Sequence, residues 1–337
     1  MRVLVIKTSS MGDVIHTLPA LADAQAALPS ITFDWVVEEA FIEIPSWHPA
    51  VDRVIPVAIR RWRKNIFAAW SSGEWRSFKR NIRKEHYDCV IDAQGLVKSA
   101  LLTLLVKAPA YGLDRQSIRE PIASLAYKHK LRVDKNQHAV ERVRELFAKT
   151  LGYEKPNTVA SYGLTRSQFA GSTVVEKNVV LLHGTTWPTK HWPPEYWRAL
   201  AHKIVAAGFR VLLPWGNDVE RERAKLIAEG SDRVEVLPRL NIKGVATALS
   251  QATAVVSVDT GLGHLSAAIG VPTLSLYSPT DPKIIGTSGD EQYHFSSSEI
   301  DDTGEIYDNT IEPVNFASMT PDRVWEKFEP ILKKSEG

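Results

Sequence analysis

The chain has 337 residues, of which 44% are hydrophobic and 24% charged, and its formal net charge is only +2. One hydrophobic core rarely serves a chain of this length, so we expect two domains. The near balance of charges argues against a protein that binds nucleic acid over a broad surface. The single cysteine, Cys89, has no partner within the chain, which is typical of a reducing compartment.

No segment of the sequence has the form of an export signal or a membrane span. Lys7 interrupts the first apolar stretch before a signal-peptide core could form. Residues 101–106 are the most hydrophobic later segment, but they are far shorter than the ~20 residues that cross a bilayer. Lys98 and Lys107 bracket that segment. We therefore expect a cytoplasmic protein without a transmembrane segment.

Short β-branched runs alternate with stretches of helical period, which predicts parallel strands covered by helices on both faces. The first half of the chain yields expected strands at residues 3–6, 33–37, 53–57 and 89–92. The second half yields strands at residues 179–182, 210–213, 234–237, 255–258 and 273–276. A polar stretch without periodicity separates the two series. The pattern predicts two doubly wound α/β domains, at residues 1–160 and 178–318, with a linker at 161–177 and a final helix within 319–337.

The first expected strand runs into a loop of small polar residues that ends at Asp13. This loop lies at the ligand-binding edge of a doubly wound sheet, but it matches neither the dinucleotide nor the P-loop motif. The Asp13 carboxylate could remove the proton of an attacking hydroxyl, which is worth roughly 10²–10⁴ in rate. Asp is also a favoured residue for capping a helix, which is its more common use at such a position.

A basic segment at residues 60–84 holds nine Lys or Arg residues and one acid, Glu74. Aromatic residues interleave with these cations, namely Trp62, Phe67, Trp70, Trp75 and Phe78. Such a surface suits a ligand that carries both phosphates and apolar material. The four cations at the start could bind carboxylates and phosphates: Arg60, Arg61, Arg63 and Lys64. Residues 76–84 are more simply a solvated helix face, and nucleic acid is a weaker rival partner.

Two loops of the second domain suggest a diphosphate site. The expected strand at 179–182 is followed by Thr185 and Thr186, whose hydroxyls could donate to a diphosphate, and then by Lys190, which could offset its charge. The strand at 255–258 runs directly into Asp259-Thr260-Gly261 and a helix, whose N-terminus attracts an anion. His264 follows about one turn later. A capped helix with a structural histidine would explain either half of this second motif alone, but it explains both halves together less well.

Two further residues could complete a nucleotide site. Glu220 stands where an acid often holds ribose hydroxyls, and Leu240 could contact a nucleobase. A solvated glutamate and a core leucine are the simpler interpretations. The sequence shows no cluster with metal-ligand spacing, so we expect neither a metal nor a cofactor.

Taken together, several segments of the chain resemble the ADP-heptose:lipopolysaccharide heptosyltransferase family, and within it the type I enzymes. They are residues 1–20, Arg-Arg-Trp-Arg-Lys at 60–64, Ile-Asp-Ala-Gln-Gly-Leu-Val-Lys-Ser at 91–99, Lys-His-Trp-Pro at 190–193 and Ser-Val-Asp-Thr-Gly-Leu-Gly-His-Leu at 257–265. The resemblance extends to about Gly286. Leu240 stands where the family pattern has Met, and residues 287–315 match little, so they receive no role.

The resemblance implies a GT-B fold, in which two Rossmann-like domains face each other across a cleft. It implies an inverting glycosyltransferase that moves L-glycero-D-manno-heptose from ADP-heptose to the first Kdo of Kdo2-lipid A, at the cytoplasmic face of the inner membrane. Asp13 would be the general base. The donor site would comprise Thr185, Thr186, Lys190, Glu220, Leu240, Asp259, Thr260, Gly261 and His264. The acceptor site would comprise Arg60, Arg61, Arg63 and Lys64, with Lys98, Arg119 and His138 as further members. The resemblance also implies that the final helix returns to the first domain.

Two other functions fit parts of this pattern. A related heptosyltransferase could act on a later core sugar, and a nucleotide-binding module could hold ADP without catalysis. The concentration of basic residues at 60–64 favours an acidic inner-core acceptor over a later sugar.

Overall fold

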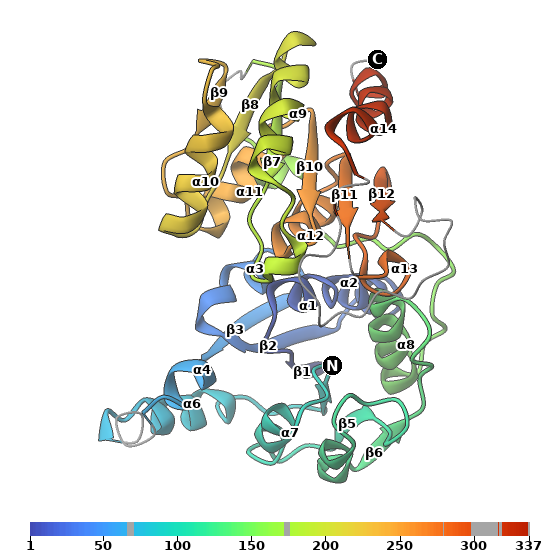
Figure 1. Ribbon diagram of the computed structural model, residues 1–337. Helices are drawn as coiled ribbons and strands as arrows, with labels where there is room; N and C mark the ends of the chain where they lie inside the picture. The colour runs from blue at the N-terminus through green and yellow to red at the C-terminus, as the bar shows by residue number, and fades with distance from the viewer. Residues whose placement is uncertain (66–70, 172–175, 279, 298–315, 317–318, 336–337) are drawn as a thin grey trace. The chain divides into compact units, whose positions relative to one another are not determined.

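The computed structural model describes residues 1–65, 71–171, 176–278, 280–297, 316 and 319–335. The chain forms two compact units, Met1–Leu164 and Thr165–Gly337, which Figure 1 colours from blue to green and from green to red. The division falls inside the segment that the sequence predicts as a linker. We describe each unit by itself.

The first unit contains a six-stranded, all-parallel sheet in the order β3-β2-β1-β4-β5-β6. Its strands are β1 (Arg2–Ile6), β2 (Thr32–Glu38), β3 (Val51–Val57), β4 (Cys89–Asp92), β5 (Ala110–Leu113) and β6 (His129–Leu131). The central strands β1 and β4 are almost wholly buried because helices cover both faces of a parallel sheet. The four expected strands are confirmed. The sequence missed β5 and β6, which are short and carry glycine or polar residues in place of a β-branched run.

The described helices of the first unit connect these strands. They are α1 (Met11–Ile15), α2 (Leu18–Ala27), η1 (Glu39–Phe41), α3 (Glu43–Ser46), α4 (Ile59–Trp62), α6 (Glu74–Ile82), α7 (Val97–Thr103), η2 (Pro121–Ala126) and α8 (Ala139–Leu151). Helix α2 packs against α8, and α7 packs against η2. The helical segment that follows β1 is split after Ile15, so Asp13 belongs to the short helix α1.

The second unit repeats the architecture with a six-stranded parallel sheet in the order β12-β11-β10-β7-β8-β9. Its strands are β7 (Asn178–Leu182), β8 (Arg210–Leu213), β9 (Val234–Val236), β10 (Ala254–Val258), β11 (Thr273–Tyr277) and β12 (Gln292–Ser296). The five expected strands are confirmed. Strand β12 lies in the stretch 287–315, which received no role from the sequence, and residues 298–315 lie outside the described ones.

The described helices of the second unit are η3 (Arg166–Gln168), η4 (Pro188–Lys190), α9 (Pro194–Ala206), α10 (Asp218–Ala228), α11 (Ile242–Ser250), α12 (Gly261–Ala268), α13 (Pro282–Ile285) and α14 (Pro321–Lys334). Throughout the described part of the chain, no helix is both long enough and apolar enough to cross a bilayer.

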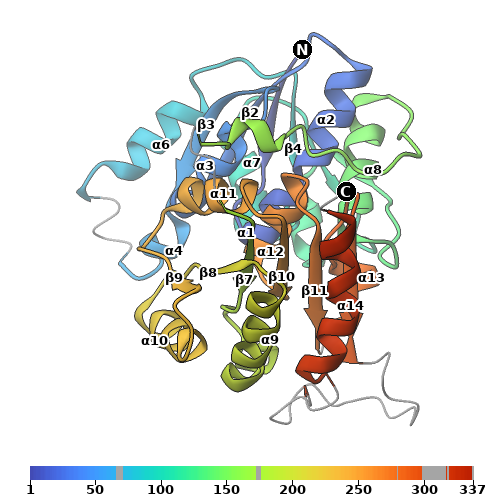
Figure 2. The same cartoon turned by 90° about the horizontal axis from the view of Figure 1, so that it is seen from above.

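The last helix, α14, begins as the sequence predicts but packs in a different place. Thr320 caps it by accepting a hydrogen bond from the backbone N–H of Arg323. Its apolar face, which includes Phe328 and Ile331, joins the core of the second unit beside α9. Figures 1 and 2 both show α14, in red, next to α9. The prediction that this helix returns to the first domain therefore differs from the observed packing. The second unit buries the apolar face of the helix itself.

A buried ion pair joins α2, α8 and the segment that follows α8. The guanidinium of Arg144 is almost inaccessible and donates to both oxygens of Asp23, at 2.7 and 3.3 Å. It also donates to Glu141 at 2.7 Å and to the backbone carbonyls of Thr158 and Pro156. Each charge is therefore paired, which offsets the cost of removing both from water.

Replacement of Arg144 should destabilise the first unit strongly. Arg144→Met would leave Asp23 buried without its partner, and we expect a loss of about 3–5 kcal/mol in the free energy of unfolding. Urea denaturation of the full chain measures this loss. Lys149→Met is the matched control, since Lys149 lies on the same helix, is 45% exposed and pairs with Glu145 on the surface. The control should cost less than about 1 kcal/mol, and equal losses in the two variants would contradict a special role for the buried pair.

Candidate active site

The strand order of each sheet defines where a ligand should bind. Connections run in opposite directions on the two sides of β1 and β4 in the first sheet, and of β7 and β10 in the second. Ligands of doubly wound sheets bind beyond the carboxyl ends of the strands at this switch point. The loops that the sequence singles out follow β1, β7 and β10. Each of them therefore lies at the switch point of its own unit.

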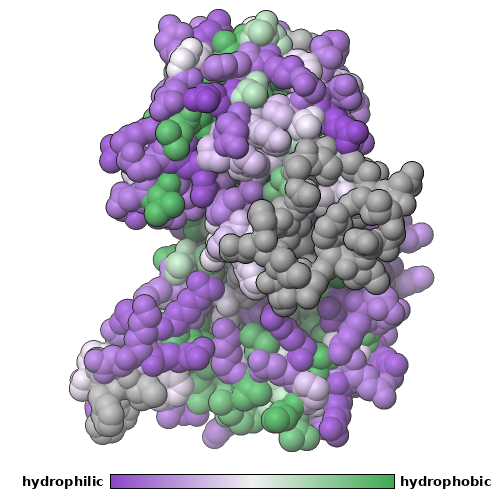
Figure 3. All heavy atoms as spheres, in the orientation of Figure 1, coloured by the Kyte–Doolittle hydropathy of each residue, from purple (hydrophilic) through white to green (hydrophobic). Residues whose placement is uncertain are grey.

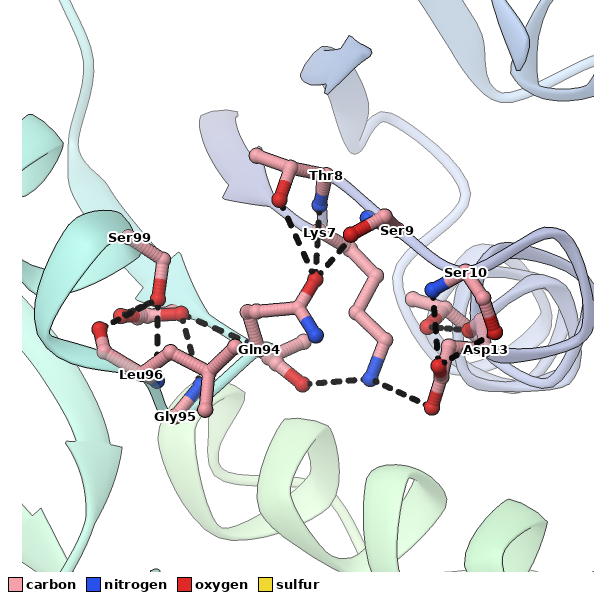
Figure 4. Close-up of polar contacts among 12 residues, drawn as sticks. Lys7, Thr8, Ser9, Ser10, Asp13, Gln94, Gly95, Leu96 and Ser99 are labelled. Atoms are coloured by element: carbon pink, nitrogen blue, oxygen red, sulfur yellow. Dashed lines mark hydrogen bonds and ion pairs between the residues drawn. The ribbon is translucent and has the colours of Figure 1, made fainter. Parts of the chain in front are cut away.

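The loop after β1 is held by a side chain that follows the neighbouring strand β4. The side-chain oxygen of Gln94 accepts hydrogen bonds from the backbone N–H groups of Thr8, at 2.9 Å, and Ser9, at 3.0 Å. It also lies 3.3 Å from the Thr8 hydroxyl. Figure 4 shows Gln94 reaching across to this loop. The position of the loop is thus set by a residue about 85 positions away in the sequence.

Asp13 uses its two oxygens differently. One oxygen accepts hydrogen bonds from the backbone N–H of Ser10, at 2.8 Å, and from the Ser10 hydroxyl, at 2.9 Å. The other faces the ammonium of Lys7 at 3.7 Å. Ser10, and not Asp13, is the N-cap residue of α1, so the alternative prediction of a capping role is wrong in its detail. Asp13 still stabilises the helix start through Ser10, while 46% of its side chain stays exposed.

Lys7 gives this loop its positive charge. Its side chain is only 8% exposed, and its ammonium donates to the backbone carbonyl of Ala93 at 2.9 Å. A cation beside a carboxylate favours the ionised form of that carboxylate. The Lys7 ammonium therefore places a positive charge next to the Asp13 carboxylate.

Beneath this loop, Asp92 organises the start of α7. It is fully buried and accepts hydrogen bonds from the backbone N–H groups of Gln94 and Gly95, from the Ser99 hydroxyl at 2.8 Å and from the Tyr127 hydroxyl at 2.7 Å. Burial raises the pKa of Asp92, and these four hydrogen bonds oppose the rise. Gly95 has a φ of +70°, which a residue with a side chain rarely adopts.

The four cations at 60–64 divide into two groups. Arg61 donates to both oxygens of Glu39 and also contacts Glu74 at 2.9 Å, so its charge is already neutralised. These two acids raise the pKa of Arg61. The guanidinium of Arg60 lies over the ring of Phe41. Arg63 and Lys64 are exposed, and neither has an ion-pair partner among the described residues.

The aromatic residues of the basic segment have a structural role that the sequence interpretation did not give them. Trp62, Trp75 and Phe78 lie with ring centroids 5.7 to 5.9 Å apart and pack onto the core of the first unit. Phe78 is buried, so the prediction that it faces an apolar ligand is wrong, whereas Trp62 and Trp75 are only partly buried. Phe67 and Trp70 lie outside the described residues. The exposed cations at Arg76 and Arg80 agree with a solvated face of α6.

The other predicted acceptor residues lie on three elements. The positive charges of Arg60 and Lys98 both act on Glu38. Burial raises the pKa of Glu38, and these two charges oppose the rise. Glu38 also accepts a hydrogen bond from the backbone N–H of Arg60 at 3.1 Å. Arg119 is exposed and precedes η2.

His138 caps α8, and its ring lies 5.8 Å from that of His16 at the end of α1. The structure thus brings Arg60 and Lys98 around one acid and His138 next to α1. Within the described residues, no side-chain hydrogen bond or ion pair joins Arg119 to these groups.

In the second unit, Asp259 connects three predicted or neighbouring residues. Its carboxylate pairs with the ammonium of Lys190 at 2.5 Å and accepts a hydrogen bond from the Thr280 hydroxyl at 2.7 Å. Its backbone carbonyl accepts a hydrogen bond from the Thr185 hydroxyl at 3.0 Å. Loops after β7, β10 and β11 therefore meet at Asp259. An ammonium carries three donors, so Lys190 keeps donors for a further anion.

The loop after β10 leads directly into α12. Thr260 is the N-cap residue and its side chain makes no capping hydrogen bond, while Gly261 begins the helix. His264 is buried in the first turns of α12. A Cβ atom on Gly263 would lie 2.7 Å from the Ser257 hydroxyl, so glycine lets α12 pack closely on β10. This close packing places the positive end of the helix at the switch point. Thr186 is exposed on the loop after β7.

Glu220 and Leu240 belong to the adjoining loops. A Glu220 oxygen accepts the backbone N–H of Gly216 at 2.7 Å, and its carboxyl carbon would lie 2.8 Å from a Cβ on Gly184. Glu220 thus lies against the loop that carries Thr185. Leu240 is half-buried after β9 and lies next to Gly244 at the start of α11.

The sequence interpretation missed Lys7, Gln94 and Thr280. Gln94 and Thr280 follow β4 and β11, which neighbour β1 and β10, the strands that precede Asp13 and Asp259. Knowledge of strand order would therefore have identified both. Lys7 offers no such signal because an isolated lysine after a strand is usually solvated. Within the described ranges, no group of three or more His, Cys, Asp or Glu residues is arranged to hold a metal ion.

Comparison with known proteins places this geometry in a family. Residues 75–312 match the model of glycosyltransferase family 9 (heptosyltransferase). Lipopolysaccharide heptosyltransferase 1 of Pseudomonas aeruginosa is 52% identical, over 100% of this chain and 99% of its own length. That of Escherichia coli K12 is 55% identical, over 87% of this chain and 92% of its own. The chain belongs to glycosyltransferase family 9.

Solved structures of the family agree with the fold. The E. coli heptosyltransferase WaaC with ADP superimposes with a TM-score of 0.89 at 49% identity, covering 98% of this chain and 100% of that one. WaaC with ADP-2-deoxy-2-fluoro heptose gives a TM-score of 0.86 at 48% identity, covering 98% and 99%. The predicted fold class, an α/β GT-B chain of two Rossmann-like domains, is confirmed, and the chain is a glycosyltransferase of the heptosyltransferase family.

Proposed function

We propose that this chain transfers L-glycero-D-manno-heptose from ADP-heptose to the first Kdo of Kdo2-lipid A, with inversion at the anomeric carbon. The observation that carries this proposal is its 52% identity, over its whole length, to a heptosyltransferase 1. Identity to heptosyltransferase 2 of E. coli K12 is only 23% over the same share of the chain. The difference favours the first heptose of the inner core over a later sugar.

The second unit would hold the donor. The N-terminus of α12 and the ammonium of Lys190 provide positive potential for a diphosphate at the same switch point. Thr185, Thr186, Thr260 and Gly261 offer hydroxyl and backbone donors around it. Glu220 would accept hydrogen bonds from the ribose, and Leu240 and His264 would line the remaining nucleotide or sugar surface. This donor is the molecule whose analogue occupies WaaC.

The reaction would be one displacement. A Kdo hydroxyl oxygen forms a bond to the anomeric carbon of heptose while the bond from that carbon to the ADP oxygen breaks. Asp13 accepts the hydroxyl proton, and the departing ADP keeps the electron pair of the broken bond. Lys190 and the start of α12 stabilise the negative charge that develops on ADP.

The first unit would hold the acceptor. Arg63 and Lys64 have no ion-pair partner among the described residues, so they would bind the acidic sugars and phosphates of the acceptor. Arg60 and Lys98 would add positive potential near Glu38, while Arg61, Arg119 and His138 would flank the site. Because this acceptor is anchored in lipid, the chain would work as a peripheral protein on the cytoplasmic face of the inner membrane.

Mass analysis tests donor, acceptor and reaction together. Incubation with ADP-heptose and Kdo2-lipid A should add one heptose to the acceptor and release ADP. A product that forms only when the acceptor already carries heptose would assign the chain to a later core sugar. ADP binding without any product would indicate that the chain is a nucleotide-binding module without catalytic activity.

The role of Asp13 predicts a separation of turnover from donor binding. Asp13→Asn keeps an oxygen that can accept from Ser10, so α1 should still form, but the amide cannot accept the proton. We expect turnover to fall by more than about tenfold while the affinity for ADP-heptose stays nearly unchanged. Lys190→Gln, in contrast, should weaken the binding of ADP, which calorimetry measures. A near-normal rate for Asp13→Asn would remove Asp13 from the mechanism.

The acceptor cations predict an effect on the acceptor KM. The double variant Arg63→Gln/Lys64→Gln should raise the KM for Kdo2-lipid A by about tenfold or more, because two charge-assisted contacts to the acceptor are lost. Arg80→Gln/Lys84→Gln removes the same charge from the exposed side of α6 and its end, and it should leave this KM within about twofold of wild type. Equal effects from both pairs would indicate general electrostatic attraction in place of a defined site.

A further inference from the structure

The first unit exposes a group of large hydrophobic side chains that its fold does not use. Among the described residues, five of the eleven exposed large hydrophobic side chains come from α7, its C-terminal end and η2. We call these five the apolar patch: Val97, Leu101, Leu104, Ile122 and Leu125. Single exposed leucines are common in folded proteins, but a cluster of them marks a surface that binds something.

The spacing of these residues places them on outward faces. Leu101 and Leu104 follow Val97 by four and seven positions, which puts the three on one side of α7. Ile122 and Leu125 are three positions apart in η2, whose 3-10 geometry repeats every three residues. The exposed fractions rise to 57% for Leu101, 61% for Leu104, 71% for Ile122 and 76% for Leu125. The patch is therefore directed to solvent.

The opposite faces of both elements already complete the core. Ala100 and Leu102 of α7 and Ala123 of η2 are buried in the hydrophobic cluster of the first unit. Folding thus needs none of the outward side chains. The two elements pack against each other, so their outward faces adjoin. Figure 3 shows hydrophobic surface over the part of the first unit where Figure 1 draws α7.

Two lysines border the apolar patch, and the segment that carries the patch is rich in positive charge. A hollow next to Leu104 is lined by Lys107 and Lys128 together with Ala126, so cations border the apolar side chains directly. Residues 97–132 contain seven Lys or Arg and only two acids, Asp114 and Glu120. Asp114 accepts the backbone N–H of Ser117, and Glu120 accepts that of Val97. Both acids are therefore engaged with the backbone, and the rim favours an anionic partner.

We propose that the apolar patch is the surface through which this chain docks on an anionic lipid membrane. Its leucine and isoleucine side chains would enter the boundary between headgroups and acyl chains, while Lys107 and Lys128 reach the lipid phosphates. The inference deepens the proposed function, on which it rests for the lipid anchor of the acceptor. Helix α7 starts at the Asp92 loop, so one short helix connects the acceptor site with the docking surface.

Vesicle binding by the full chain, without donor or acceptor, tests the proposal. Wild type should sediment with vesicles of equal phosphatidylglycerol and phosphatidylcholine and bind pure phosphatidylcholine vesicles more weakly. Leu104→Gln/Leu125→Gln should lower the partition coefficient on anionic vesicles by about tenfold or more, because two exposed leucines no longer enter the lipid. Lys107→Gln/Lys128→Gln should lower binding to anionic vesicles only, and added salt should shrink that difference.

Two exposed hydrophobic residues outside the apolar patch provide the control. Val159 is 60% exposed and Leu226 is 49% exposed, so Val159→Gln/Leu226→Gln removes similar side chains elsewhere. This control should bind vesicles as wild type does. Unchanged binding by Leu104→Gln/Leu125→Gln, or an equal loss in the control, would overturn the proposal. A wild-type dimer that Leu104→Gln/Leu125→Gln converts to monomer in ultracentrifugation would also overturn it, since a second copy would then cover the patch.

A second measurement separates this proposal from the proposed function. Leu104→Gln/Leu125→Gln should transfer heptose to a water-soluble, deacylated form of the acceptor at the wild-type rate, but more slowly to acceptor embedded in vesicles. If wild type gives no product with either acceptor, the proposed function fails while the vesicle result stands. If the variant loses transfer to the soluble acceptor, the patch acts in the reaction itself and the docking role is refuted.

Discussion

The parallel pairing of β1 with β4 is the constraint on which the candidate site of the first unit depends. Both strands end at one edge of the sheet, so the loop after β1 meets Gln94 and Asp92 there. Asp92 is costly to bury, and four hydrogen bonds to its carboxylate offset that cost. Those hydrogen bonds fix the start of α7, and Gln94 in turn fixes the loop that leads to Asp13. The proposed base thus owes its position to a buried carboxylate that takes no part in the reaction.

The second unit has the same kind of strand order, and there it brings an ion pair to the carboxyl ends of the central strands. Asp259 and Lys190 form an ion pair at the carboxyl ends of β7 and β10, beside the start of α12. A buried cation would be costly alone, and its pairing keeps it in place before an anion arrives. The helix N-terminus and the unused donors of Lys190 then add to the potential for a diphosphate. Transfer chemistry of the proposed kind needs positive potential at the leaving group and a base at the acceptor, and under the proposed function the two units would divide these tasks.

The elements that carry the apolar patch are joined to the site of the first unit. Tyr127, just after η2, donates to Asp92, and α7 begins at the Asp92 loop. Both elements that carry the patch are therefore joined to the same buried carboxylate that orders the proposed acceptor site. An enzyme that acts on a lipid-anchored sugar must hold the sugar at a fixed height above the lipid surface. A docking surface built on α7 and η2 would set that height through short, well-packed elements.

The sequence by itself determined the fold class, the central strands and the identity of the site loops. Buried parallel strands are continuous β-branched runs, and the loops after them carry local motifs that need no knowledge of neighbours. Short strands such as β5 and the packing of α14 were decided by tertiary structure, because each is stabilised by residues distant in the chain. The same holds for the pairing of Arg61 with Glu39, the core packing of Trp62 and the contact of Lys7 with Asp13. Sequence spacing shows which residue types are present, but only the folded chain decides which of their charges and apolar surfaces are already paired and which are left to bind a ligand.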